Sequence, residues 1–282
     1  MVRKMQLGIR LHDTKKLPIE ERLADVKRMG FACGHMALAK VMPERNTSDE
    51  ALTPGFAMYL KNLFQKNQLD CAVLGCYLNL ANPDPVQLAQ IAERYKAHIR
   101  FASLLGCGVV GTETGAPNTT YTFVPECHSE EALRIFILNL RPVVDYAEKM
   151  GVIVAIEPVW CHIVNTPERA RRVLDVIDSP NLQIILDPVN LLHDGNYKQD
   201  QEVIARAFEL LGKDIAVMHI KDYDIRDGHL VSMGAGLGRM DYTSQVRFIK
   251  EHKPFMHVTL EDTVPENNES CRIFFQKLYD EQ

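Results

Sequence analysis

The sequence predicts an α/β fold, a single (β/α)8 barrel of the TIM type that occupies residues 1–282 as one domain. Apolar strand-like runs alternate with amphipathic helix-like stretches from one end of the chain to the other. The strand-like runs are continuously apolar, as expected for parallel strands covered on both faces. No linker, low-complexity segment or break in composition interrupts the alternation.

Eight repeats can be placed along the chain. The strand-like runs lie near 5–9, 31–36, 70–76, 107–112, 152–157, 182–187, 215–220 and 255–261. The helix-like stretches cover about 19–29, 49–67, 85–105, 129–150, 167–178, 199–211, 241–252 and 266–280. Asp84, Ser129 and Thr166 are capping side chains before three of the helices, twice followed by Pro at the first helical position. An open doubly wound sheet would normally show a Gly-rich phosphate turn after an early strand, and the first run leads to none.

The composition is that of an ordinary soluble protein, with 46% hydrophobic and 24% charged residues. A formal net charge of -5 argues against a large phosphate-backbone surface, so no nucleic-acid partner is expected. The seven cysteines are odd in number and form no C-x-x-C pair, which favours buried reduced thiols in a cytoplasmic protein. The sequence shows neither the apolar segment of a signal peptide at its start nor a run long enough to span a membrane, so no membrane partner is expected.

Four polar residues follow the last four strand-like runs at the point where each run ends. They are Glu157, Asp187, His219 and Glu261. An unpaired charge in a dry core costs several kcal/mol, so these side chains are expected at a shared site instead. In a barrel, all strands end at the face that carries the active site. Two Glu, one Asp and one His suit a divalent metal ion.

The segments around these residues carry a family resemblance. They are Ile156-Glu157-Pro158, Leu186-Asp187-Pro188-Val189-Asn190, His219-Ile220-Lys221-Asp222 and Leu260-Glu261-Asp262. Together with Gly111–Gly115 and Gly234–Tyr242, they resemble the sugar phosphate isomerase/epimerase superfamily, also called xylose isomerase-like TIM barrels. The resemblance implies that the four residues hold one divalent cation, Mn²⁺, Mg²⁺ or Co²⁺, with Zn²⁺ as a further option. It also implies a small-molecule sugar or polyol as substrate, and dimers or tetramers occur in the superfamily.

The same resemblance implies that Glu157 and Glu261 are catalytic and exchange protons with carbon on opposite sides of the substrate. The chemistry agrees, because a cation that binds a carbonyl and a neighbouring hydroxyl acts as a Lewis acid and stabilises an enediolate. A carboxylate on each face can remove and return a proton. The expected function is therefore a metal-dependent isomerase or epimerase of a free or phosphorylated sugar.

Five further residues are candidates for substrate binding. His35 lies at the end of the second strand-like run, Glu113 follows the fourth, and Lys221 shares a strand face with His219. Asn190 stands where ketose epimerases of the superfamily commonly have a His, and Arg226 is the nearest candidate for an Arg that contacts substrate. The stretch Gly234–Gly238 is open to three interpretations, a phosphate-binding loop, a lid or a plain turn.

Other functions remain open at this point. An inosose-type dehydratase, which is a lyase, would use the same metal site. An apurinic endonuclease would need additional metal ligands and a basic groove, which an acidic chain does not favour. A non-catalytic sugar-binding barrel would have little need of all four ligands. The sequence leaves open the substrate, its phosphorylation, the metal and the oligomeric state.

Overall fold

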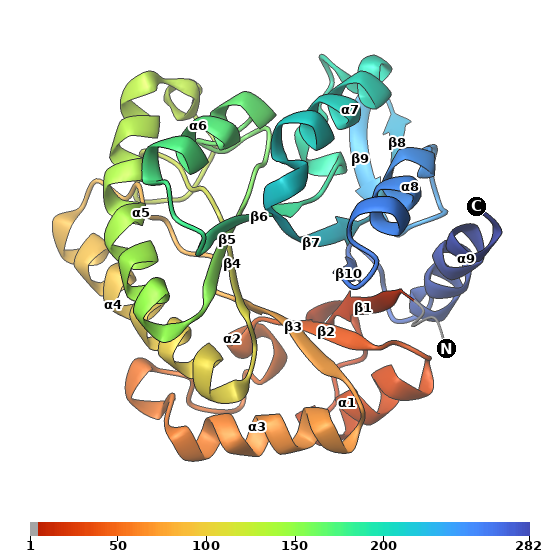
Figure 1. Cartoon of the computed structure of the whole chain (residues 1–282), viewed down its shortest axis with the longest axis horizontal. Helices are drawn as coiled ribbons and strands as arrows, with labels where there is room; N and C mark the ends of the chain where they lie inside the picture. The colour runs from red at the N-terminus through yellow and green to blue at the C-terminus, as the bar shows by residue number, and fades with distance from the viewer. Residues whose placement is uncertain (1–4) are drawn as a thin grey trace.

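The computed structural model describes residues 5–282, and within them eight parallel strands close a barrel (Figure 1). The strands follow the order β1-β10-β7-β6-β5-β4-β3-β2 around the barrel. Their bounds are β1 Gln6–Arg10, β2 Cys33–Met36, β3 Asp70–Gly75, β4 Val109–Glu113, β5 Ile153–Glu157, β6 Leu182–Leu186, β7 Ile215–Ile220 and β10 His257–Leu260. The predicted barrel fold is confirmed. Residues 1–4, which begin the segment predicted to lack a signal peptide, lie outside the described part of the chain.

The longer helices form a ring outside the strands, and the short helix α2 lies inward of α3 (Figure 1). The helices are α1 Ile19–Arg28, α2 Leu38–Val41, α3 Pro54–Lys66, α4 Pro85–Leu105, α5 Glu130–Met150, α6 Pro167–Ile177, α7 Asp200–Leu211, α8 Thr243–His252 and α9 Asn268–Glu281. The three predicted caps are present: the side chains of Asp84, Ser129 and Thr166 accept hydrogen bonds from first-turn backbone N–H groups of α4, α5 and α6. None of the described helices is long and apolar enough to cross a membrane.

Besides the short unpredicted helix α2, two segments differ from the prediction. The helix expected over 49–67 is a short 3₁₀ turn, η2 (Asp49–Ala51), followed by α3, which begins only at Pro54. Pro54 disfavours helical backbone at the residue before it, and Thr53 is accordingly extended. The Thr53 side chain caps α3 by accepting a hydrogen bond from Phe56 N. After β7, the chain forms an unpredicted antiparallel hairpin of β8 (Asp222–Arg226) and β9 (His229–Met233).

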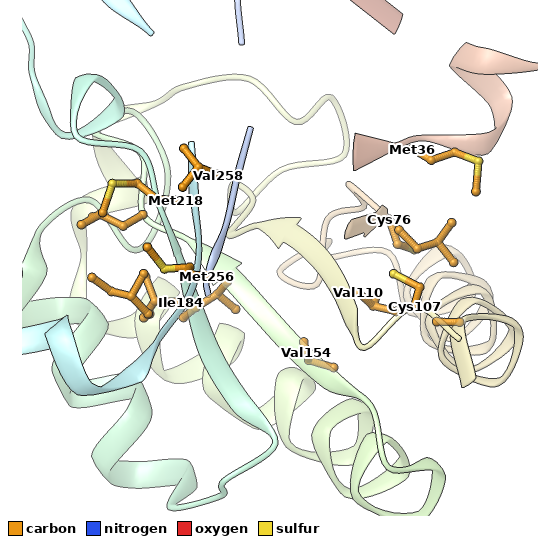
Figure 2. Packing of buried hydrophobic residues seen from close by; sticks show 14 of the residues in the cluster. Met36, Cys76, Cys107, Val110, Val154, Ile184, Met218, Met256 and Val258 are labelled. Carbon is orange, nitrogen blue, oxygen red and sulfur yellow. The ribbon is translucent and has the colours of Figure 1, made fainter. Parts of the chain in front are cut away.

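The strands bury side chains on both faces. Met218 of β7 and Val258 of β10 are in register and lie side by side in the large cluster of buried residues (Figure 2). A separate small cluster of buried residues includes the interior residues Ala155, Ile185 and Val217 and consists of Cys33, Ala72, Val73, Ala155, Ile185 and Val217. Because successive side chains of a strand alternate between its faces, the residue two positions beyond an interior residue also faces inward.

Candidate active site

The alternation of strand faces brings the four predicted ligands together. Glu157, Asp187 and His219 each lie two residues beyond an interior apolar residue of β5, β6 or β7. Glu261 directly follows β10. One ligand atom from each of the four lies within 4.8 Å of those of the others, and all four residues are buried. The carboxyl ends of these strands therefore place two glutamates, an aspartate and a histidine around one point.

The imidazole of His219 lies between the two glutamates. Its Nδ1 atom is 3.0 Å from Glu261 Oε1 and 3.3 Å from Glu157 Oε1. Asp187 is oriented by its own loop, because its Oδ1 accepts from the backbone N–H groups of Val189 and Asn190. The other carboxylate oxygen, Oδ2, is buried and has no hydrogen-bond partner.

Lys221 and Asn190 connect the aspartate to Glu157. The Lys221 ammonium donates to Asn190 Oδ1 at 2.7 Å and lies 3.2 Å from Asp187 Oδ2. The contact with Asp187 is an ion pair whose geometry does not make a hydrogen bond, in agreement with the unpartnered Oδ2. Asn190 Nδ2 in turn donates to Glu157 Oε1 at 2.7 Å. Since Lys221 is a donor only, it fixes the orientation of the Asn190 amide.

Arg10, at the end of β1, holds the opposite side of the cluster. Its Nη1 donates to Glu261 Oε2 at 3.3 Å, its Nη2 to Asp262 Oδ1 at 2.8 Å, and its Nε to Asp13 Oδ2 at 2.8 Å. Arg10 was not among the site residues predicted from the sequence. The signal was present, because Arg10 ends a strand in the same way as the four ligands do.

His35 and Glu113 also line the mouth of the barrel. The His35 ring stacks on that of His219 with centroids 5.2 Å apart, and its Nε2 lies 3.1 Å from the hydroxyl of Tyr77. Glu113 is in register with Glu157 across β4 and β5, and it accepts a hydrogen bond from Tyr121. Of the five candidate substrate-binding residues, His35, Asn190, Lys221 and Glu113 thus gather at or beside the ligand cluster.

Arg226 does not join them. It is the last residue of β8, exposed at the turn of the hairpin, and within the described chain it makes no ion pair. The hairpin was not predicted, so its effect on the direction of this segment could not be predicted either. The Gly234–Gly238 stretch is a turn organised by Asp222, whose carboxylate accepts from Gly236 N and Met240 N. The Gly236 N–H group is therefore already bonded and is not free for a phosphate.

Burial raises the pKa values of the three carboxyl groups, whereas neighbouring positive charges lower them. Burial raises the pKa of Glu157 and of Asp187. Burial acts in the same direction on Glu261, but the neighbouring charges of His219, Arg10 and Lys221 outweigh it and hold the pKa of Glu261 low. The two glutamates of the predicted acid/base pair consequently occupy different electrostatic environments.

The residues fit a divalent cation. Three carboxylates and one imidazole converge, and both Asp187 Oδ2 and His219 Nε2 are buried without a hydrogen-bond partner. A buried polar atom without a partner is costly, so such atoms mark a place where a ligand completes the site. A cation bound among the four residues would accept electron pairs from oxygen and nitrogen atoms of the kinds that Mn²⁺, Mg²⁺, Co²⁺ and Zn²⁺ all bind.

The comparisons with known proteins agree with this geometry. No functionally curated protein matches the sequence. Solved structures similar over 98% of this chain include apo 3-keto-D-glucoside 4-epimerase YcjR from E. coli, at 16% identity, 100% of its own chain and a TM-score of 0.74. They also include IOLI with a bound zinc atom, at 20% identity over 96% of its own chain and with a TM-score of 0.71. A third is D-psicose 3-epimerase from Clostridium cellulolyticum H10 with D-tagatose, at 16% identity over 99% of its own chain and with a TM-score of 0.72. Residues 23–272 match the family described as xylose isomerase-like TIM barrel, and the chain belongs to that family.

Proposed function

We propose that this protein is a divalent-metal-dependent isomerase or epimerase of a sugar or sugar phosphate. The observation that carries the proposal is the convergence of Glu157, Asp187, His219 and Glu261 within 4.8 Å at the carboxyl ends of four strands. Membership of the family and the sugar epimerases among its structural neighbours support it. When bound, the cation would supply Lewis-acid polarisation of a carbonyl and a neighbouring hydroxyl.

The chain's own residues would move the proton. Glu157 and Glu261 approach His219 from different strands, with each Oε1 atom within 3.3 Å of its Nδ1. One carboxylate takes a proton from the carbon next to the carbonyl, and the other returns a proton to the opposite face or to the neighbouring carbon. Asn190 and Arg10 would hold Glu157 and Glu261 in position through the hydrogen bonds described above.

His35 and Lys221 would orient the substrate. His35 is fully buried against His219, and burial lowers its pKa well below the usual value, so it is a neutral donor or acceptor. Lys221 presents a cation beside Asp187, where it can compensate negative charge that develops on substrate oxygen. Both groups are held by neighbouring side chains before any substrate binds, which reduces the cost of reorganisation.

Solvent exchange tests the proposal directly. The Mn²⁺-loaded protein is incubated in D₂O with a panel of ketoses, their phosphates and inosose-type polyols, and the products are read by NMR and mass spectrometry. The expected result is a new isomer or epimer that carries deuterium at the carbon where the proton was exchanged. Loss of water, seen as a diketone-type absorbance, would instead identify a dehydratase. Metal binding without exchange or water loss on any member of the panel would contradict an enzymatic role on these substrates.

A further inference from the structure

A second feature at the mouth of the barrel is a cleft of about 710 Å³ beside the segments that follow β1 and β2. Its charged or titratable lining residues are His12, Lys16, Arg22, Lys40, Glu44 and Arg45. Four of them are permanently cationic and one is a carboxylate. In a chain with a net charge of -5, such a local excess of positive charge does not follow from composition.

Arg22 is the most unusual of these residues because its charge is buried. It is 4% exposed, and its guanidinium donates to the backbone carbonyls of Leu17 and Leu11, each at 3.2 Å. No carboxylate of residues 5–282 comes within 4.0 Å of it, and burial lowers its pKa. Neutral carbonyls satisfy two of its donors, and the one carboxylate that acts on its charge, Glu44, forms no ion pair with it. A buried charge without a paired partner is costly.

Two lysines at the rim are also free. Within the described residues, neither Lys16 nor Lys40 forms an ion pair, and both are exposed. Arg45 is different, since it pairs with Glu20 and Glu44 and lies over the ring of Tyr59. The charges available to a ligand in the cleft are therefore those of Arg22, Lys16 and Lys40.

The cleft adjoins the metal-ligand cluster. His12 belongs to the 3₁₀ turn η1 (Leu11–Asp13), which directly follows β1, and it lines the cleft. Arg10, two residues before His12, donates a hydrogen bond to Glu261. On the other side, Lys40 lies on α2, which begins at Leu38, and it is four residues beyond Met36, the last residue of β2. A small molecule with one end at the four ligands can thus extend toward the cleft, whose volume is within the range of ligand pockets.

We propose that this cleft binds an anionic group, a phosphate ester or a carboxylate, at the end of the substrate remote from the metal ligands. Arg22 would supply a buried guanidinium, and Lys16 and Lys40 would close over the anion from the rim. Guanidinium and ammonium groups bind oxyanions through charge-assisted hydrogen bonds. That the anion belongs to the substrate rests on the proposed function, whereas binding of the anion by the cleft does not.

The experiment measures binding of inorganic phosphate by calorimetry. The full-length protein is first stripped of metal and desalted, so that no cation at the four ligands can hold the phosphate. The expected result is saturable binding that weakens about tenfold in Lys40→Met and more in Arg22→Gln. Lys149→Met is the matched control, because Lys149 is an exposed lysine at the end of α5, outside the cleft, and binding should be unchanged there. Arg22 is buried, so Arg22→Gln can be unstable. The exposed Lys40 can be replaced without that risk, and phosphate binding by Lys40→Met therefore decides the test.

Competition identifies the source of the anion. Displacement of phosphate by millimolar acetate would indicate a carboxylate ligand, and resistance to acetate would indicate a phosphate ester. Absence of phosphate binding, or equal binding by wild type and Lys40→Met, would overturn the proposal. Phosphate binding without solvent exchange on any sugar would contradict the proposed function and leave the cleft assignment standing. Solvent exchange on a sugar without phosphate binding would contradict the cleft assignment and leave the proposed function standing.

Discussion

The two sides of the barrel mouth differ in charge. The side formed by β5, β6, β7 and β10 gathers three carboxylates around His219, and Lys221 and Arg10 reach in to compensate them. The side formed by the segments after β1 and β2 carries Arg22, Lys16 and Lys40, and no described carboxylate pairs with them. On the acidic side Glu261 and Asp187 pair with Arg10 and Lys221, whereas on the basic side Arg22, Lys16 and Lys40 form no described ion pair. We infer that the mouth is built for a substrate whose two ends differ in charge.

The largest expected effect lies on the acidic side. Glu261→Gln removes one of the four proposed metal ligands and one member of the proposed acid/base pair, so turnover should fall by about 10³-fold or more. Solvent deuterium exchange and metal content measured on the same sample check both roles. Glu266→Gln is the control, because Glu266 is exposed and lies only five residues away. Wild-type turnover in Glu261→Gln would exclude this glutamate from the chemistry.

The next largest effect concerns the stability that Lys221 gives to the acidic side. Lys221→Met removes a buried cation from beside Asp187 and Asp262, and the metal-free protein should lose about 3–5 kcal/mol of unfolding free energy. Saturating Mn²⁺ should restore part of that loss, because the added cation compensates the same carboxylates. Urea unfolding with and without Mn²⁺ measures both quantities. An equal loss in both conditions would mean that Lys221 and the metal do not share their carboxylates.

The acidic side of the mouth could be predicted from the sequence. Glu157, Asp187 and His219 end apolar strands, so the period of two that places Ala155, Ile185 and Val217 inside the barrel also places these residues at its mouth. This rule applies equally to Arg10, which was missed because a single charged residue after one short strand resembles an ordinary loop residue.

The basic side could not be predicted in this way. Arg22 lies in a helix and Lys16 in a loop, and nothing in their local sequence distinguishes them from surface cations. Only the tertiary structure shows that the Arg22 charge is buried without a carboxylate. The β8–β9 hairpin was missed for a related reason, since its half-exposed residues give no continuous apolar run. Arg226 was expected near the substrate as the nearest candidate for the Arg of the family, and the hairpin instead places it at an exposed turn.

A smaller effect should come from the link between Lys221 and Glu157. Asn190→Ala removes the donor that orients Glu157, and kcat should fall about tenfold while metal content stays at the wild-type level. Asn190→Asp keeps the size of the side chain but replaces the donor with an acceptor, so kcat should fall further. Steady-state kinetics on the substrate found by exchange provides the measurement. If Asn190→Asp were more active than Asn190→Ala, Asn190 would not act as a donor to Glu157.

The smallest effect concerns His12, which lies where the two sides meet. Burial and nearby cations lower its pKa to about 4, from an ordinary 6.5. The charged groups around it are Arg10, Arg22, Lys40, Asp13 and Glu261. Because the folded form takes up this proton only near pH 4, the unfolded chain binds more protons below pH 6.5. The contribution of His12 to stability is therefore complete above 6.5 and is lost as the pH falls toward 4, by about 1–2 kcal/mol after allowance for solvent screening.

An anion in the cleft should reduce the part of this pKa shift that comes from the neighbouring cations. Phosphate would offset the charges of Arg22 and Lys40, so the pKa of His12 should rise toward 6.5 when phosphate is added. An NMR titration of the histidine ring signals measures the change, with His12→Gln used to assign the signal. His98 serves as the internal control, because burial also lowers its pKa to about 4, but it lies on α4 and does not line the cleft. A shift of both histidines would indicate a general salt effect, whereas a shift of His12 alone would place the anion on the basic side of the mouth.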